Sequence, residues 1–503
     1  MSVQHLLRMP GALSCGISHF PSTACMVRGT FVLASLTAAT LIETPTASAV
    51  PSFARQTGQP CATCHTAFPE LTPFGRQFKL MGYTSGGTRC GDGSAKSDET
   101  QVPLSVMAWP ATFTSVRSNL AQQSPGWQAS NINNNEWIPG QFSLFVAGQL
   151  YCNVGAFAQM TYDRVGNSFG WDNTDIRYAD TGRIEGTNII YGLTANNNPT
   201  VQDVWNSTPA WSFPYISSSV AAVPGVSTML GGSAWAQQVG GIGGYVWIND
   251  SFYAEFTAYG ALDARLATDL GADPAAPRFA NAAPYWRFAY ENKWDKNSLM
   301  FGTFGMYADV QPVGISALNP INPTGLSYGG VTDPFLDIGV DTQYQWIGEE
   351  NIFSVRASYI WERQKLNGQS NPASNGGVPL SNSVDYVNDF NISASYIYQR
   401  MVSLTVGYFN TWGTSDALAY SSLPGGVGYF TSGSPNSSGW NVDLAYLPFS
   451  DGGPDLWPWF NARLGVLYTH YDRFDGSTNN VDEVPGLKAS GNDTVFLYSW
   501  LMF

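Results

Sequence analysis

Cys61, Cys64 and His65 are the residues of this chain whose types and spacing most directly indicate chemistry. They stand in the run Cys61-Ala62-Thr63-Cys64-His65, a C-x-x-C-H pattern. Two thiols at this spacing form thioethers to the vinyl groups of a haem, and the adjacent histidine then binds the iron as its proximal ligand. The pattern predicts one covalently attached haem c, which makes His65 a metal-binding residue.

Two other uses of the motif agree less well with the rest of the chain. A closed zinc site needs four ligands, and no second Cys/His pair accompanies Cys61 and Cys64. A thioredoxin-like redox motif would stand in a βαβ context, which the flanking sequence does not provide.

A short helix is expected directly after the motif. Thr72 is a good N-cap, Pro73 a good first helical residue, and Gly82 suits the position just past the end. Such a helix would hold the haem segment in place beside its cofactor.

The side chains of this helix divide into a stripe and a basic pair. Phe74, Phe78 and Met81 fall at i, i+4 and i+7, so they share one face. That face would pack on the haem or against the rest of the protein, and the two possibilities are compatible. Arg76 and Lys79 lie off the stripe and are candidate contacts for the haem propionates.

The second axial ligand of the iron stays open between several candidates. Met81 ends the helical stripe, and Met107 follows the segment with a parity that would point it inward. His470 is disfavoured, because it shares the parity of apolar outward residues in its strand. A five-coordinate iron or a ligand other than methionine is also compatible with the sequence.

Two further cysteines, Cys90 and Cys152, remain in the expected mature chain. Thiols in an oxidising compartment pair or bind something. A disulfide between them would tie the haem segment to the rest of the protein, and two unpaired buried thiols are the alternative.

The N-terminus reads as an export signal covering residues 1–49. Arg28 precedes an apolar stretch from Phe31 to Ile42, and a small-residue site follows at Ala47-Ser48-Ala49. A short membrane anchor is the other reading, but the stretch is short for a span. Met26 is a second candidate start. The net charge of −14 argues against a nucleic-acid partner, because binding of nucleic acid needs a basic face.

From residue 104 to 503 the chain repeats short alternating runs. Phe353, Val355 and Tyr359 share one parity, whereas Ser354 and Arg356 share the other. Strand side chains alternate between faces, so each run has an apolar and a polar side. The aromatic apolar face, and tight turns that alternate with long loops, favour an outer-membrane barrel over a soluble sandwich.

We therefore expect an all-β fold, a transmembrane antiparallel β-barrel of about sixteen strands. The strands are expected to start near residues 104, 141, 155, 174, 187, 241, 252, 284, 297, 334, 351, 386, 402, 438, 458 and 494. An even number closes a barrel with both termini in the periplasm. Inward parity falls on several charged and polar side chains, namely Glu255, Thr257, Arg287, Glu291, Arg356 and Arg463.

Residues 50–103 are too few to enclose a haem with a core of their own. A barrel of about sixteen strands has a lumen that can hold a small insert. The sequence thus predicts a helical c-type cytochrome segment, residues 50–103, that plugs the lumen of an outer-membrane barrel, residues 104–503.

At this point the chain resembles a known family. The stretch Phe53-Ala54-Arg55-Gln56-Thr57-Gly58, the motif 61–65, Pro73-Phe74-Gly75-Arg76 and Phe78-Lys79-Leu80-Met81-Gly82-Tyr83 are similar to the fused outer-membrane monohaem cytochrome–porin of iron-oxidising bacteria. The likeness in motifs covers about 30 residues, and the remainder is similar in architecture and length. The resemblance implies haem attachment at Cys61, Cys64 and His65, and oxidation of extracellular Fe(II). It also implies delivery of electrons to a periplasmic c-type cytochrome or blue-copper protein.

Three functional hypotheses follow for the sequence. The first is an oxidoreductase that passes electrons from extracellular Fe(II) through one haem. The second is a haem-bearing conduit for another donor, such as an electrode, a mineral or an organic reductant. The third is a porin whose haem is structural or sensory. No Ser/His/Asp or Cys/His catalytic set can be assembled from the residues expected on the inner side.

Overall fold

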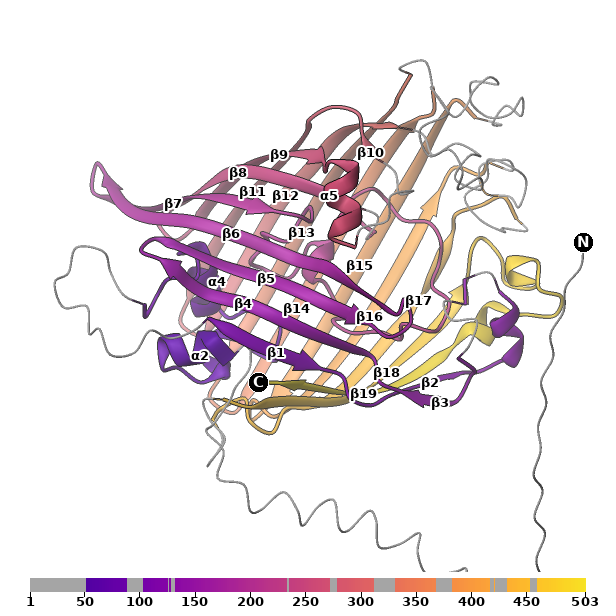
Figure 1. Ribbon diagram of the computed structural model, residues 1–503, viewed down its shortest axis with the longest axis horizontal. Helices are drawn as coiled ribbons and strands as arrows, with labels where there is room; N and C mark the ends of the chain where they lie inside the picture. Colours follow the sequence, from indigo (N-terminus) through magenta and orange to yellow (C-terminus); the bar gives the residue numbers. More distant parts are fainter. Residues whose placement is uncertain are drawn as a thin grey trace, which may run out of the picture. The chain divides into compact units, whose positions relative to one another are not determined.

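The computed structural model describes residues 51–87, 103–124, 126–127, 132–232, 235–271, 278–311, 331–367, 382–416, 420, 432–452 and 459–503. These residues belong to one compact unit, Thr46–Phe503. They form a closed antiparallel β-barrel (Figure 1). In this part of the chain, no helix combines the length and the apolar character needed to cross a membrane.

The strands follow one another around the barrel. They are β1 (Leu104–Ala108), β2 (Thr112–Val116), β3 (Glu136–Ile138), β4 (Gln141–Tyr151), β5 (Val154–Asp163), β6 (Ser168–Ile184), β7 (Thr187–Asn196), β8 (Val239–Ile248), β9 (Phe252–Ala261), β10 (Arg278–Phe279), β11 (Ala283–Trp294), β12 (Asn297–Gln311), β13 (Asp333–Ile347), β14 (Asn351–Lys365), β15 (Val384–Tyr398), β16 (Val402–Gly413), β17 (Ser437–Tyr446), β18 (Asn461–Arg473) and β19 (Thr494–Met502).

These nineteen segments make sixteen barrel strands in the described residues. Three pairs of segments, β1 with β2, β3 with β4 and β10 with β11, each continue one strand across an irregularity. The barrel closes where β1 pairs with β19, with Met107 opposite Met502. The predicted barrel is confirmed. The expected start of one strand near 174 was late, because β6 begins at Ser168, and the start near 458 was early, because β18 begins at Asn461.

The alternation of side chains explains why these segments form a barrel. In β14, Ser354 and Arg356 are buried in the lumen, whereas Phe353 on the outer face is 40% exposed. The other side chains with inward parity, among them Glu255, Arg287 and Arg463, are also buried. Strands such as β14 thus present a polar face to the lumen and an apolar face outward, as their period of two requires.

The two ends of the barrel differ in their connections. At one end, turns of two or three residues join β4 to β5, β6 to β7, β8 to β9, β11 to β12, β13 to β14 and β15 to β16. The first residue of β1 and the last residue of β19 lie at this end as well. Most connections at the other end are long, such as residues 197–238 and 474–493.

A helical plug, which we define as residues 51–87, occupies the short-turn end of the lumen (Figure 1). It contains α2 (Pro51–Thr57), α3 (Cys61–Cys64) and α4 (Pro73–Leu80). The helix predicted after the motif is confirmed, because the Thr72 hydroxyl accepts the backbone N–H of Gly75 at 3.2 Å at the start of α4. A Cβ on Gly75 would lie 2.2 Å from the carbonyl oxygen of Cys64, so only glycine allows α3 and α4 to pack this closely.

Buried charges hold the plug against the barrel wall. The Arg76 guanidinium pairs with Glu291 on β11 at 2.6 Å and donates to Gln343 and Gln345 on β13 at 2.9 and 2.8 Å. Glu70 lies 3.6 Å from Arg356 on β14. Because removal of one partner from a buried ion pair leaves an uncompensated charge, these contacts fix the plug strongly.

A second insert, which we define as the lumen loop, residues 197–232, folds inward from the long-loop end. Val204 and Trp205 are completely buried, and Asp203 pairs with Arg287 at 3.2 Å. The loop meets the plug where Asn206 accepts the backbone N–H of Leu71 at 2.9 Å. The sequence did not predict this insert, because its residues show neither a strand pattern nor a motif.

Candidate functional site

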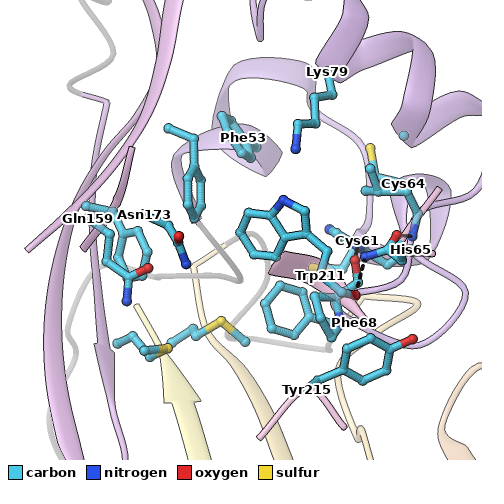
Figure 2. A pocket seen from close by; sticks show the side chains of 18 of the residues that line it. Phe53, Cys61, Cys64, His65, Phe68, Lys79, Gln159, Asn173, Trp211 and Tyr215 are labelled. Atoms are coloured by element: carbon cyan, nitrogen blue, oxygen red, sulfur yellow. Dashed lines mark hydrogen bonds between the residues drawn. The ribbon is translucent and has the colours of Figure 1, made fainter. Parts of the chain in front are cut away.

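A cavity of about 400 Å³ lies between the plug, the lumen loop and the barrel wall. Its volume is within the range of small-molecule and cofactor sites. Figure 2 shows Cys61, Cys64 and His65 on one side of the cavity and Gln159 and Asn173 on the opposite side. Most of the lining is aromatic or apolar, so the cavity suits a large, flat, mainly apolar group.

The C-x-x-C-H motif forms one wall of the cavity. Both cysteines lie on α3, a single helical turn that brings their side chains to the same opening. The plug's contacts with neighbouring turns fix this element: Arg400 donates to the carbonyl oxygen of Ala62 at 2.8 Å, and the N–H of Ala62 donates to Ser450 at 2.8 Å. Burial, with Cys61 close by, raises the pKa of the Cys64 thiol to about 12.

His65 is held in an orientation that suits a metal ligand. Its Nδ1 lies 3.1 Å from the carbonyl oxygen of Pro69, so Nδ1 carries the proton in that contact and Nε2 keeps its lone pair. Burial lowers the pKa of His65 to about 4, against the opposing effect of hydrogen bonds to the Pro69 and Glu70 backbone. A neutral imidazole with a fixed tautomer is the form that binds iron.

The barrel seam forms another wall of the cavity. Met107 and Trp109, which follow the inward parity of β1, line it together with Trp500 and Met502 of β19. A row of aromatic rings connects the seam to the motif: His65 to Phe68 at 5.1 Å, Phe68 to Trp500 at 4.9 Å and Trp500 to Trp109 at 6.0 Å between centroids. The cavity thus touches the plug and both terminal strands of the barrel.

The lumen loop supplies the remaining wall. Trp211 lies in the cavity (Figure 2). Its Nε1 donates to the carbonyl oxygen of Val201 at 2.6 Å. The ammonium of Lys79 lies 5.0 Å from the Trp211 ring and donates to the carbonyls of Val201 and Asp203 at 2.7 and 2.9 Å. Burial, assisted by the charge of Arg177, lowers the pKa of Lys79 to about 7.

The structure places the candidate residues in and directly after helix α4 in three different surroundings. Phe78 and Lys79 line the cavity, as a role near a haem requires. Phe74 and Met81 instead line a separate groove between α4 and the ends of β6, β7 and β8, and Phe78 also reaches it. Arg76 does not line the cavity, because its guanidinium is used by Glu291, Gln343 and Gln345. Of the two methionines considered for the distal position, Met107 lies in the cavity and Met81 in the groove.

Cys152 is disulfide-bonded. It lies in the two-residue turn between β4 and β5, at the same end of the barrel as the plug. Its expected partner, Cys90, lies outside the described residues.

Sequence reasoning missed most of the barrel-wall and lumen-loop residues that line the cavity, among them Trp109, Trp211, Trp500 and Met502. Parity offered a signal for three of these four, since Trp500 and Met502 alternate with outward-facing residues in β19 and Trp109 continues the parity of β1. No signal existed for Trp211, because its position depends on the inward path of the lumen loop.

The residues present fit a covalently bound haem. Two cysteines and a histidine open onto one mainly apolar cavity, and several buried polar atoms in its lining have no hydrogen-bond partner, namely Trp109 Nε1, Trp500 Nε1 and Tyr215 Oη. Cys61 and Cys64 would form the thioethers, His65 Nε2 would bind the iron, and the orphaned donors are available to an oxygen-rich group. Among the described residues, no three His, Cys, Asp or Glu side chains gather as a metal-ion site would require.

Fold and site together define a class: a closed sixteen-strand barrel whose lumen holds an N-terminal plug with a C-x-x-C-H cavity. No protein-family model and no curated protein matches the sequence. Solved structures with a similar architecture include the outer-membrane protein OmpT of Vibrio cholerae, with 9% identity, a TM-score of 0.38 and coverage of 80% of this chain and 96% of that chain. The outer-membrane channel DcaP of Acinetobacter baumannii has 10% identity, a TM-score of 0.43 and coverage of 80% and 96%. OprB of Pseudomonas putida has 11% identity, a TM-score of 0.39 and coverage of 79% and 92%.

Proposed function

We propose that the protein is an electron conduit of the bacterial outer membrane. It would oxidise extracellular Fe(II) by one-electron transfer through a single haem c and pass the electrons to periplasmic carriers. In this proposal it is an oxidoreductase of the iron:cytochrome c type, and its acceptor is a soluble c-type cytochrome or a blue-copper protein.

The outer surface of the barrel supports a membrane location. Large apolar side chains remain exposed on strand after strand, for example Leu193 at 59%, Ile242 at 74% and Phe256 at 61%. Soluble monomers rarely expose a contiguous apolar surface beyond a few hundred Å². Aromatic pairs stand outward near both ends, with Phe252 beside Tyr290 at the short-turn end and Tyr408 beside Trp440 at the long-loop end. Two such girdles mark the interfaces of outer-membrane barrels.

The connections support one orientation. Outer-membrane barrels place short turns in the periplasm and long loops outside. The plug lies at the short-turn end, so we propose that both barrel termini and the plug face the periplasm. Extracellular Fe(II) would then approach from the long-loop end, and the periplasmic carrier from the side of the plug.

The single observation that carries the proposal is the cavity shared by Cys61, Cys64 and His65 inside the barrel. When bound there, the haem supplies a one-electron Fe(III)/Fe(II) couple. The protein's own residues would hold this group by covalent attachment, orient the imidazole through the Pro69 carbonyl, and line the cavity with aromatic side chains.

The two inserts favour electron transfer over solute passage. The plug and the lumen loop both pack into the lumen, and Arg76, Asp203 and Trp205 anchor them to the wall. A filled lumen would keep Fe(II) and its oxidation product out of the periplasm while electrons pass. This favours a conduit over the second candidate function, a porin with a structural haem, although both share the same fold.

An anaerobic reduction experiment tests the proposal. The detergent-solubilised protein, with its haem oxidised, is mixed with Fe(II) at acidic and at neutral pH, and the haem absorbance is followed. We expect rapid, stoichiometric reduction. If Fe(II) leaves the haem oxidised while dithionite reduces it, the iron assignment is wrong, and a panel of other reductants would identify a conduit for another donor. Solute conductance through the barrel would instead support the porin.

A further inference from the structure

Two indole groups in the barrel wall have no structural explanation of their own. Trp109, which directly follows β1, and Trp500 on β19 both line the cavity, and the Nε1 atom of each is buried without a hydrogen-bond partner. An indole N–H is a donor only, and a buried donor left unpaired costs free energy. Native proteins retain few such groups, and each calls for an explanation.

Two other tryptophans of the lumen have hydrogen-bond partners for their indole N–H groups. Trp211, in the same cavity, donates to the carbonyl oxygen of Val201 at 2.6 Å, and Trp205 donates to Glu291 at 3.1 Å. The protein thus supplies acceptors for the indoles of Trp211 and Trp205, whereas it supplies none for Trp109 and Trp500. The unsatisfied pair sits at the seam of the barrel, with ring centroids 6.0 Å apart.

We propose that Trp109 and Trp500 donate hydrogen bonds to the propionate carboxylates of the haem. This inference rests on the proposed function, since it requires a haem in the cavity. A haem c is attached through its vinyl edge, and its two propionates project from the opposite edge. Donors for the propionates must therefore lie apart from the iron ligand and the thioethers. The Phe68 ring contacts both His65 and Trp500, at centroid distances of 5.1 and 4.9 Å, and Trp109 packs on Trp500 at 6.0 Å, so the two indoles are one and two rings removed from the motif.

The basic residues of the plug are less suited to the same task. Arg76 is bound to Glu291 and lies outside the cavity. Lys79 lines the cavity but donates to two backbone carbonyls of the lumen loop. Carboxylates accept N–H donors well, so two indoles can bind the propionates without adding a buried positive charge.

The proposal assigns a function to the seam of the barrel, where β1 pairs with β19. The plug would hold the thioether edge of the haem, and the first and last strands of the barrel would hold its carboxylate edge. Complete binding of the cofactor would then require a closed barrel. Trp109 and Trp500 are positioning residues in this scheme, and they act on the potential of the haem through the charge of its propionates.

The test uses the intact haem-loaded protein with Trp109→Phe, Trp500→Phe and the double variant. Trp211→Phe is the matched control, because its indole lies in the same cavity and already has a partner. Haem content is measured by the pyridine haemochrome spectrum and barrel folding by heat-modifiable migration. The readout is the midpoint potential as a function of pH, which reports ionisation of the propionates.

Removal of a donor destabilises the anionic propionate. We expect the redox-linked pKa to rise by about one pH unit in each single variant, a tenfold change in the ionisation constant, and more in the double variant. We also expect the midpoint potential to fall at neutral pH, because a less screened carboxylate favours Fe(III).

If the redox-linked pKa and the midpoint potential move no further than in Trp211→Phe while haem content and folding are unchanged, the inference is wrong. A wild-type protein without covalent haem would overturn the proposed function, whereas a haem that Fe(II) cannot reduce would leave the propionate result readable.

Discussion

The plug and the outer part of the lumen loop fill the same lumen but are attached to its wall by different groups. The plug uses charged side chains, as in the pairs Arg76–Glu291 and Glu70–Arg356. The outer part of the lumen loop brings backbone N–H groups to carboxylates on the wall: Thr228 to Asp389 at 2.6 Å, Met229 to Glu362 at 2.5 Å and Leu230 to Asp337 at 2.7 Å.

This difference assigns different tasks to the two inserts. The plug carries Cys61, Cys64 and His65, so its role depends on the identity of individual side chains. The loop needs only to lie across the lumen, and its backbone can be held by acids that three neighbouring strands provide. In the proposed function, the plug would supply the chemistry and the loop would control passage through the lumen.

The largest expected effect comes from the plug's cysteines. Replacement of Cys61 and Cys64 by serine removes both thioether donors, so we expect complete loss of covalently bound haem, measured by haem staining after denaturing electrophoresis. The barrel does not depend on these thiols, so heat-modifiable migration should persist. His470→Ala is the control and should keep its haem. Haem that remains attached in the double serine variant would contradict the assignment.

The next effect concerns passage through the lumen. Replacement of residues 216–232 by a Gly/Ser segment of equal length removes buried apolar side chains such as Ile216, Val220 and Leu230. The more flexible backbone would then leave its hydrogen bonds to the carboxylates of the wall more often. We expect ion conductance in planar bilayers to rise well above that of the wild type, with haem content unchanged. If conductance stays at the wild-type level, the plug alone seals the barrel and the division of tasks is wrong.

The anchor of the plug can be weakened by a single change. Arg76→Ala leaves Glu291 buried without its cation, and such a loss costs about 3–5 kcal/mol. We expect the urea concentration at which the plug becomes accessible to protease to fall. Arg183→Ala is the control, because Arg183 is exposed, and it should change stability by less than about 0.5 kcal/mol. Equal sensitivity of both variants would show that the ion pair does not fix the plug.

The smallest expected effect is a pH dependence of the loop's outer attachment. Gly225 donates its N–H to Asp475 at 3.0 Å. Asp475 lies beyond the end of β18, and Asp482 accepts a hydrogen bond from Ser124. Burial raises the pKa of both carboxyls, and the charge of Asp482 raises that of Asp475 further.

Because Asp475 and Asp482 bind protons more tightly in the folded state than in the unfolded state, the attachment of the loop to these carboxyls is most stable at low pH. Its stability falls as the pH rises from the ordinary pKa of Asp through the raised values. We expect hydrogen exchange of the Gly225 amide to accelerate over that range. Asp475→Asn keeps an acceptor without the titration, so its exchange should lose this additional pH dependence. The same pH profile in both proteins would contradict the assignment.

The sequence by itself determined the barrel and the motif, because both are local. A period of two in segments such as Phe353 to Trp361 requires two unlike faces, and a series of such segments separated by alternating short and long connections can satisfy its backbone only by closing. Thr72, Pro73 and Gly82 similarly specify the ends of α4 without reference to anything distant. The C-x-x-C-H spacing is chemistry within five residues.

Only the tertiary structure decided which side chains share the cavity. Arg76 and Lys79 are three residues apart, yet the wall offers Glu291 to one and leaves the other in the cavity. Trp211 depends on the inward path of the lumen loop, and Trp109 meets Trp500 only because the first and last strands pair. These contacts join residues up to several hundred positions apart, and no local pattern encodes them, because packing in the closed lumen selects them.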